Sequence, residues 1–140
     1  MDSGTAILVL ILVASSVFGL NRLRTDGKVI LHLPGHYVSP QALGHELGAS
    51  ASFIQFSSPY CQPCKATHSL IDSLIAGLPD VAHIDLQVAD HLNMVNTLHI
   101  MRTPTTVLVD GKGLIKYRSE GLPRATELQD ALNRIISAHS

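Results

Sequence analysis

The chain has no tryptophan, few other aromatic residues and only two cysteines, Cys61 and Cys64. Cysteines this close in sequence cannot join distant parts of a fold, so a framework of structural disulfides is excluded. Charge of either sign is also scarce: lysine and arginine number 10 against 11 acidic residues. Without a basic excess or cluster, no nucleic-acid partner is expected. Repeats and low-complexity tracts are absent, and 140 residues suffice for one domain with a short appendage.

Long apolar runs occur only at the N-terminus, where no charged residue interrupts Gly4 to Leu20. As a helix, this segment would span about 26 Å, close to the roughly 30 Å of a bilayer core. We therefore expect an uncleaved transmembrane anchor at residues 1–20, inserted through residues 4–20. A cleaved signal peptide is an alternative, although Asp2 is the only side-chain charge before the segment and a positive n-region is missing. A core helix fits less well, because a helix in a small domain needs a polar face.

Positive charges follow this segment, at Arg22, Arg24 and Lys28. Because such charges favour the cytoplasmic side, the expected topology is a single-pass membrane protein with its domain in the cytoplasm. An extracytoplasmic domain, after a signal anchor or a cleaved signal peptide, is the alternative. Residues 21–27 are polar, contain an Asp-Gly turn signal and are expected to form a linker to a domain at residues 28–140.

Strand and helix patterns alternate through that domain. Strands are predicted at residues 28–33, 51–56, 81–86, 103–110 and 114–118, and helices from residue 39 and at 64–76, 89–98 and 123–138. In the third of these helices, Leu92 is expected to face inward. The last two strands flank a turn that begins Asp110-Gly111, a strong hairpin signal. This order predicts an α/β fold with a mixed central sheet flanked by helices on both faces.

The most informative motif is Cys61-Gln62-Pro63-Cys64, which follows a predicted strand and begins a predicted helix. Unpaired N–H groups and the macrodipole at a helix N-terminus favour an anion. Such a position can lower the pKa of a thiol from about 8.5 into the range of roughly 3.5–7.5. One turn later, Cys64 is close enough to close a short disulfide. We interpret the pair as a dithiol–disulfide active site.

These features together resemble the thioredoxin family over roughly residues 28–139. The shared features are the order of elements, the cysteine pair at a helix start, and Thr103-Pro104 before the hairpin, with Pro104 43 positions after Cys61. The apolar segment followed by Gly19-Leu20-x-Arg-x-Arg further resembles small membrane-anchored thioredoxin-like proteins of actinobacteria. The resemblance implies a thioredoxin-like fold and a thiol–disulfide oxidoreductase of protein disulfides, acting as a reductase if its domain is cytoplasmic. It implies an upstream reductant or oxidant as a second partner, a role in cell redox homeostasis, and no cofactor beyond the redox-active disulfide.

The resemblance also implies roles for individual residues. Cys61 would be the nucleophile that forms a mixed disulfide with the substrate, and Cys64 the resolving thiol. Pro104 would be a cis-proline against the cysteine pair, and Thr103 would offer its backbone to the substrate chain. Pro63 matches the proline of the family's Gly-Pro dipeptide.

Several residues depart from the family pattern. Tyr60 and Ser57 stand where tryptophans are usual, and Gln62 replaces the glycine between the cysteines. Gln55 occupies the position of a buried aspartate that takes the proton of the resolving thiol, and His83 lies near the position of that aspartate's lysine partner. We hypothesise that Gln55 and His83 replace the pair. Since an amide cannot accept this proton, resolution of mixed disulfides would be slower.

A metal-binding function is the alternative. His68 follows Cys64 by four positions, and two thiolates with an imidazole suit copper or zinc. A thioredoxin-fold metallochaperone would use Cys61, Cys64 and His68. The set lacks the fourth ligand of a closed zinc site, and the motif is not Cys-x-x-Cys-His, which excludes covalent haem attachment.

Overall fold

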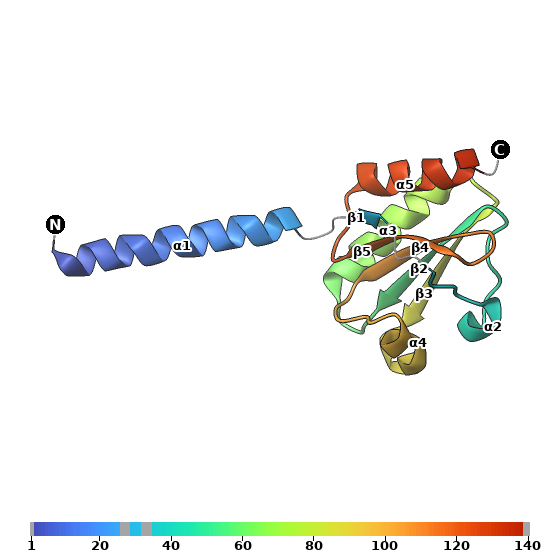
Figure 1. Cartoon of the computed structure of the whole chain (residues 1–140), viewed down its shortest axis with the longest axis horizontal. Coiled ribbons are helices and arrows are strands. Elements are labelled where there is room, and N and C mark those ends of the chain that lie inside the picture. Colours follow the sequence, from blue (N-terminus) through green and yellow to red (C-terminus); the bar gives the residue numbers. More distant parts are fainter. Residues whose placement is uncertain (1, 26–28, 32–34, 139–140) are drawn as a thin grey trace.

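The computed structural model describes residues 2–25, 29–31 and 35–138 (Figure 1). Its elements, in chain order, are α1 (Ser3–Thr25), β1 (Val29–Leu31), α2 (Pro40–Leu43), β2 (Ala51–Ser57), α3 (Gln62–Ile75), β3 (Val81–Gln87), the 3₁₀ turn η1 (Val88–Asp90), α4 (Leu92–Thr97), β4 (Thr105–Asp110), β5 (Ile115–Glu120) and α5 (Ala125–Ala138). The predicted alternation of strands and helices after α1 is confirmed.

The strands form a mixed sheet in the order β1-β5-β4-β2-β3. β2 and β3 are parallel, whereas β2–β4, β4–β5 and β5–β1 are antiparallel. Helices α3 and α5 lie on one face, and α2 and α4 lie on the other (Figure 1). The predicted fold class is therefore confirmed. In this order β4 is the middle strand, β2 lies between β4 and β3, and β3 is an edge strand of the described sheet.

Burial of both faces explains why every residue of β2 is buried. Phe53 packs toward α3 and α5, in a cluster with Ile71 and Leu132. Ile54 and Phe56 point the opposite way, into the cluster that includes Leu43 and Leu86. Side chains alternate between the two faces along a strand, so Gln55 and Ser57 must share the Phe53 face. A polar pair is thereby placed beneath α3, directly before the cysteine motif.

The helix α1 is long and apolar enough to cross a membrane, and none of its candidate span is buried in the structure. A signal sequence satisfies the same criteria. The helix continues to Thr25, so residues 21–25 of the expected linker are helical. Residues 26 and 27 of that linker lie outside the described residues. The physical reason is that Asn21 to Thr25 contains no glycine or proline, and the first helix breaker is Gly27.

Two details differ from the sequence predictions. The helix expected at residues 89–98 is divided into η1 and α4 by His91, whose φ of −130° is not helical. Leu92 is 60% exposed rather than inward-facing, because the break rotates α4 relative to the predicted register. Of the strand expected at residues 28–33, only Val29–Leu31 lies within the described residues.

Candidate functional site

The cysteine motif lies where β2 ends and α3 begins. Cys61 is the N-cap of α3, and its Sγ accepts a hydrogen bond from the Cys64 N–H at 3.2 Å. Pro63 lies in the first turn, where the missing N–H of proline costs nothing. The two sulfurs form a disulfide with an S–S distance of 2.11 Å. The predicted helix-start position of Cys61 and the short disulfide are both confirmed.

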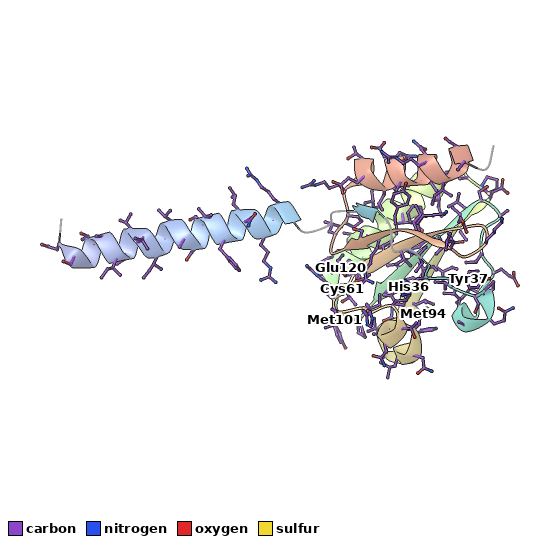
Figure 2. The ribbon with its side chains drawn as sticks, viewed as in Figure 1. His36, Tyr37, Cys61, Met94, Met101 and Glu120 are labelled. Atoms are coloured by element: carbon purple, nitrogen blue, oxygen red, sulfur yellow. A yellow bond between two sulfur atoms is a disulfide. The ribbon has the colours of Figure 1, made fainter. Side chains whose placement is uncertain are left out.

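The two sulfur-bearing residues differ in accessibility. Cys61 is partly exposed, whereas Cys64 is 4% exposed. Figure 2 shows Cys61 at the same end of the domain as Met101, which is 85% exposed. Tyr60, next to Cys61, is 99% exposed. An incoming disulfide can therefore meet Cys61 first, on a surface with apolar side chains nearby.

The Thr103–Pro104 peptide bond is cis, the conformation that the family resemblance implies. A hydrogen bond of 2.8 Å between the hydroxyls of Ser58 and Thr103 joins this segment to the loop before Cys61. The Pro104 carbonyl accepts a hydrogen bond from the Gly121 N–H. Residues 58 and 103 thus hold the two halves of the predicted site together.

Gln55 is completely buried beneath the motif. Its Nε2 donates to the Cys64 carbonyl at 2.8 Å and to the Ser57 hydroxyl at 3.0 Å. A carbonyl only accepts, so this contact orients the amide. The Gln55 Oε1 then faces His83 Nε2 at 3.2 Å. The structure therefore brings together the two residues that were expected to replace the aspartate–lysine pair of the family.

His83 connects this amide to two acidic residues and a second imidazole. Its Nδ1 lies 2.7 Å from Asp72 Oδ1, and His68 Nε2 lies 3.2 Å from Asp72 Oδ2. His68 Nδ1 in turn lies 3.0 Å from Asp85 Oδ2. The two rings have centroids 4.6 Å apart. Since an ionised carboxylate only accepts, each nitrogen–carboxylate contact requires a proton or a cation between its partners.

Asp72 and Asp85 are the site residues that sequence reasoning missed. The available signals were two spacings: His68 and Asp72 are four apart on a helix, and His83 and Asp85 are two apart on a strand. Each spacing places both members on one face of its element. That the two faces meet depends on how α3 packs on β3, which neither spacing encodes.

A pocket of about 400 Å³ adjoins the disulfide and is lined by Tyr60, Cys61, Cys64, His68 and Asp85, among others. Gln62 is exposed at the first residue of α3, between the two cysteines in sequence. The metal alternative requires Cys61, Cys64 and His68 to converge. Among the described residues, the potential ligand atoms that cluster around His68 come instead from Asp72 and His83.

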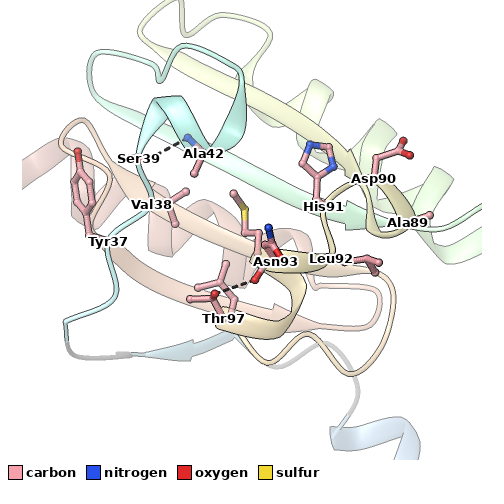
Figure 3. Close-up of a pocket in the computed structure, with 12 residues that line it drawn as sticks. Tyr37, Val38, Ser39, Ala42, Ala89, Asp90, His91, Leu92, Asn93 and Thr97 are labelled. Atoms are coloured by element: carbon pink, nitrogen blue, oxygen red, sulfur yellow. Dashed lines mark hydrogen bonds between the residues drawn. The ribbon is translucent and has the colours of Figure 1, made fainter.

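A larger groove of about 570 Å³ lies between α2 and the η1–α4 segment (Figure 3). Its lining is largely apolar, with Val38, Leu92 and Leu98. The hydrogen bonds drawn there are local to the helices, such as that from the Ala42 N–H to the Ser39 hydroxyl. The lining of this groove contains no nucleophile paired with a base. The smaller pocket contains the cysteine pair and is therefore the candidate site for chemistry.

Comparisons with known proteins agree with this geometry. The family model described as Thioredoxin matches residues 39–134. Mitochondrial thioredoxin 3 from Saccharomyces cerevisiae superimposes with a TM-score of 0.54 at 24% identity, covering 61% of this chain and 78% of that chain. Thioredoxin from Malassezia sympodialis gives 0.54 at 20% identity, over 75% and 96%. A mutant thioredoxin from Halobacterium salinarum gives 0.55 at 21%, over 62% and 75%. No curated protein matches the chain significantly.

Proposed function

This chain belongs to the thioredoxin family and is a thiol–disulfide oxidoreductase, and we propose that it works as a membrane-anchored reductase of protein disulfides through Cys61 and Cys64. The observation that carries the proposal is the asymmetry of the cysteine pair. Cys61 is partly exposed at the N-cap of α3, and Cys64 is buried behind it within disulfide distance. Such a pair can attack an external disulfide with one sulfur and release it with the other.

The reaction begins with the reduced dithiol. The Cys61 thiolate attacks one sulfur of a substrate disulfide, a new S–S bond forms, and the other substrate sulfur leaves as a thiolate that takes a proton from solvent. Cys64 then attacks Cys61 Sγ, which breaks the mixed disulfide and releases the second substrate thiol. The substrate gains two electrons and two protons, and Cys61–Cys64 becomes a disulfide. A two-electron thiol donor must then reduce the protein again.

Thr103 and Pro104 support binding of an extended substrate segment. Proline has no N–H, and we assign the backbone of Thr103 to pairing with the substrate chain. Tyr60, exposed beside Cys61, offers an aromatic face to the residues that flank the substrate cysteine. The contact between Ser58 and Thr103 keeps these two segments in register.

Gln55 and His83 form the buried polar pair behind Cys64. The Gln55 amide holds the Cys64 carbonyl but cannot accept the proton of the Cys64 thiol. We infer that this proton leaves through water, and that resolution is slower than with a buried carboxylate. Gln62, exposed between the cysteines, and Pro63 in the first helical turn complete the residues that we expect to tune the pair.

The apolar helix α1 supports anchoring of this reductase in a membrane. Arg22 and Arg24 in its last turn favour a domain on the cytoplasmic side. In that compartment thiols are kept reduced, so the physiological direction is reduction. An extracytoplasmic domain would favour oxidation or a dedicated reductive pathway instead.

The reduction potential of Cys61–Cys64, measured by equilibration with dithiothreitol or glutathione buffers, tests the proposal. We expect a reversible disulfide with a potential nearer to about −270 mV than to about −120 mV. The Cys64→Ser variant should accumulate a mixed disulfide with a protein substrate, whereas Cys61→Ser should form none. A potential near the oxidising end would contradict the reductase, and a pair that forms no disulfide but binds Cu(I) tightly would support the metallochaperone.

A further inference from the structure

We propose that His68, Asp72 and His83 form a binding site for one divalent transition-metal ion, with Zn²⁺ the best-fitting ion, beside the redox disulfide and independent of its sulfurs. Each of these residues offers one ligand atom, and the atoms lie within 4.8 Å of one another. Two imidazoles and a carboxylate are a common donor set for zinc, with a water as the fourth ligand of an open tetrahedral site.

The contact distances are close to those that the ion requires. A tetrahedral ion with bonds of about 2.0–2.1 Å holds its ligand atoms roughly 3.3 Å apart. Asp72 Oδ1 lies 2.7 Å from His83 Nδ1, and Asp72 Oδ2 lies 3.2 Å from His68 Nε2. The Asp72 side chain is 53% exposed, so it can rotate outward and lengthen the 2.7 Å contact toward the separation that an ion needs. When the ion binds, it replaces the protons that lie between the imidazole nitrogens and Asp72, and these protons pass to solvent.

The groups around the imidazoles provide the strongest support. A metal-bound histidine typically donates its other ring N–H to a carboxylate or carbonyl oxygen, which fixes the ring. Here the outer nitrogen of His83 faces the Gln55 amide oxygen at 3.2 Å, and that of His68 faces Asp85 at 3.0 Å. The remaining nitrogens, His68 Nε2 and His83 Nδ1, therefore both face the Asp72 carboxylate.

The two histidines differ in how far their side chains are exposed to solvent. The His83 side chain is 5% exposed and held on β3, whereas His68 is 46% exposed. An ion can thus enter from solvent onto one fixed ligand. His68 and Asp85 also line the pocket of about 400 Å³ that contains Cys61 and Cys64. The site lies one helical turn beyond Cys64, and Gln55 links His83 to the Cys64 carbonyl.

The test is Zn²⁺ titration of the full-length protein in detergent micelles with the disulfide intact, by calorimetry. We expect one ion per chain. Asp72→Asn and His68→Asn should each weaken binding by more than about tenfold, and Asp85→Asn by about tenfold, a usual effect of losing an outer partner. His45→Asn and Asp130→Asn, exposed elsewhere, should bind as the unchanged protein does.

Co²⁺ provides a second readout, because its visible spectrum should show tetrahedral nitrogen and oxygen ligation without the charge-transfer band of a thiolate. Thermal unfolding of each variant separates loss of ligand from loss of fold. The proposal is overturned if the oxidised protein binds no Zn²⁺, or if the folded Asp72→Asn and His68→Asn variants bind it unchanged. It is equally overturned if binding appears only after reduction, since Cys61, Cys64 and His68 would then be the ligands.

Discussion

Gln55 is the residue whose surroundings say most about the chemistry of the pair. It is fully buried, donates to the Cys64 carbonyl and accepts from His83. A carboxylate at this position could take the proton of the Cys64 thiol, and the amide cannot. The residue therefore supports the fold around the disulfide while leaving the resolving thiol without a buried base.

Replacing Gln55 by aspartate should restore such a base. Burial raises the pKa of an introduced carboxyl, so its basic form grows as pH rises. We expect Gln55→Asp to resolve mixed disulfides faster than the unchanged protein, by a ratio that increases between about pH 6 and pH 8. Stopped-flow measurement of resolution checks this, with exposed Gln41→Asp as the control. A ratio that stays constant across this range would show that Gln55 does not limit resolution.

Tyr60 shows a different kind of constraint, because its φ of 62° is left-handed. This conformation costs an L-residue about 1–2 kcal/mol, and glycine adopts it freely. The side chain is 99% exposed, so its removal loses no packing. Tyr60→Gly should therefore raise the free energy of unfolding by about 1 kcal/mol in urea titrations. Tyr37→Gly, at another exposed tyrosine with ordinary φ, should not stabilise; equal gains in both variants would refute the strain argument.

Single residues differ in how visible they are in the sequence. Cys61 and Cys64 are recognisable because their function depends on a local spacing, and Pro104 because of its distance from them. Asp72 and Asp85 are not, because their partners come from a second element. Whether His83 reaches Asp72 depends on the packing of α3 against β3, which is a property of the folded chain.

At the scale of elements, strands were easier to predict than helix ends. β2 and β4 are buried along their whole length, and β3 buries Val81, Ile84 and Leu86, so the positions of these strands follow from burial. The α4 region has apolar residues at helical spacing, yet His91 interrupts it and Leu92 turns outward. Short helices have little hydrogen-bonding of their own, and tertiary contacts decide their limits.

In the turn after β4, the backbone of Gly111 lies close against the segment before β2. A Cβ on Gly111 would overlap the backbone carbonyl of Ala49, whereas a Cβ on Gly77, after α3, would meet nothing within 4 Å. Backbone atoms cannot move aside cheaply, so Gly111→Ala should lower the free energy of unfolding by about 1–3 kcal/mol. Gly77→Ala should raise it by about 0.4–1 kcal/mol by restricting the unfolded chain. Chemical denaturation measures both, and a loss at Gly77 matching that at Gly111 would contradict the packing explanation.

At the scale of the molecule, the chain divides into an apolar helix and a domain with its own core. The candidate span in α1 has no burial against the rest of the structure, and both core clusters lie within residues 38–135. The length and composition of α1 were evident from the sequence. Its function as an anchor or a signal, and the side on which the domain lies, depend on a membrane and a translocation machinery outside the chain.

The charges after the apolar segment make the orientation testable. Arg22 and Arg24 should retain the domain in the cytoplasm, so a membrane-impermeant maleimide, added to intact cells with an impermeant reductant, should label Cys61 only after lysis. Arg22→Gln with Arg24→Gln removes most of the charge bias and should make part of the population accessible. Arg134→Gln, on the distant helix α5, should have no effect. Labelling of the unchanged protein in intact cells would place the domain outside, and the same site would then face an oxidising compartment.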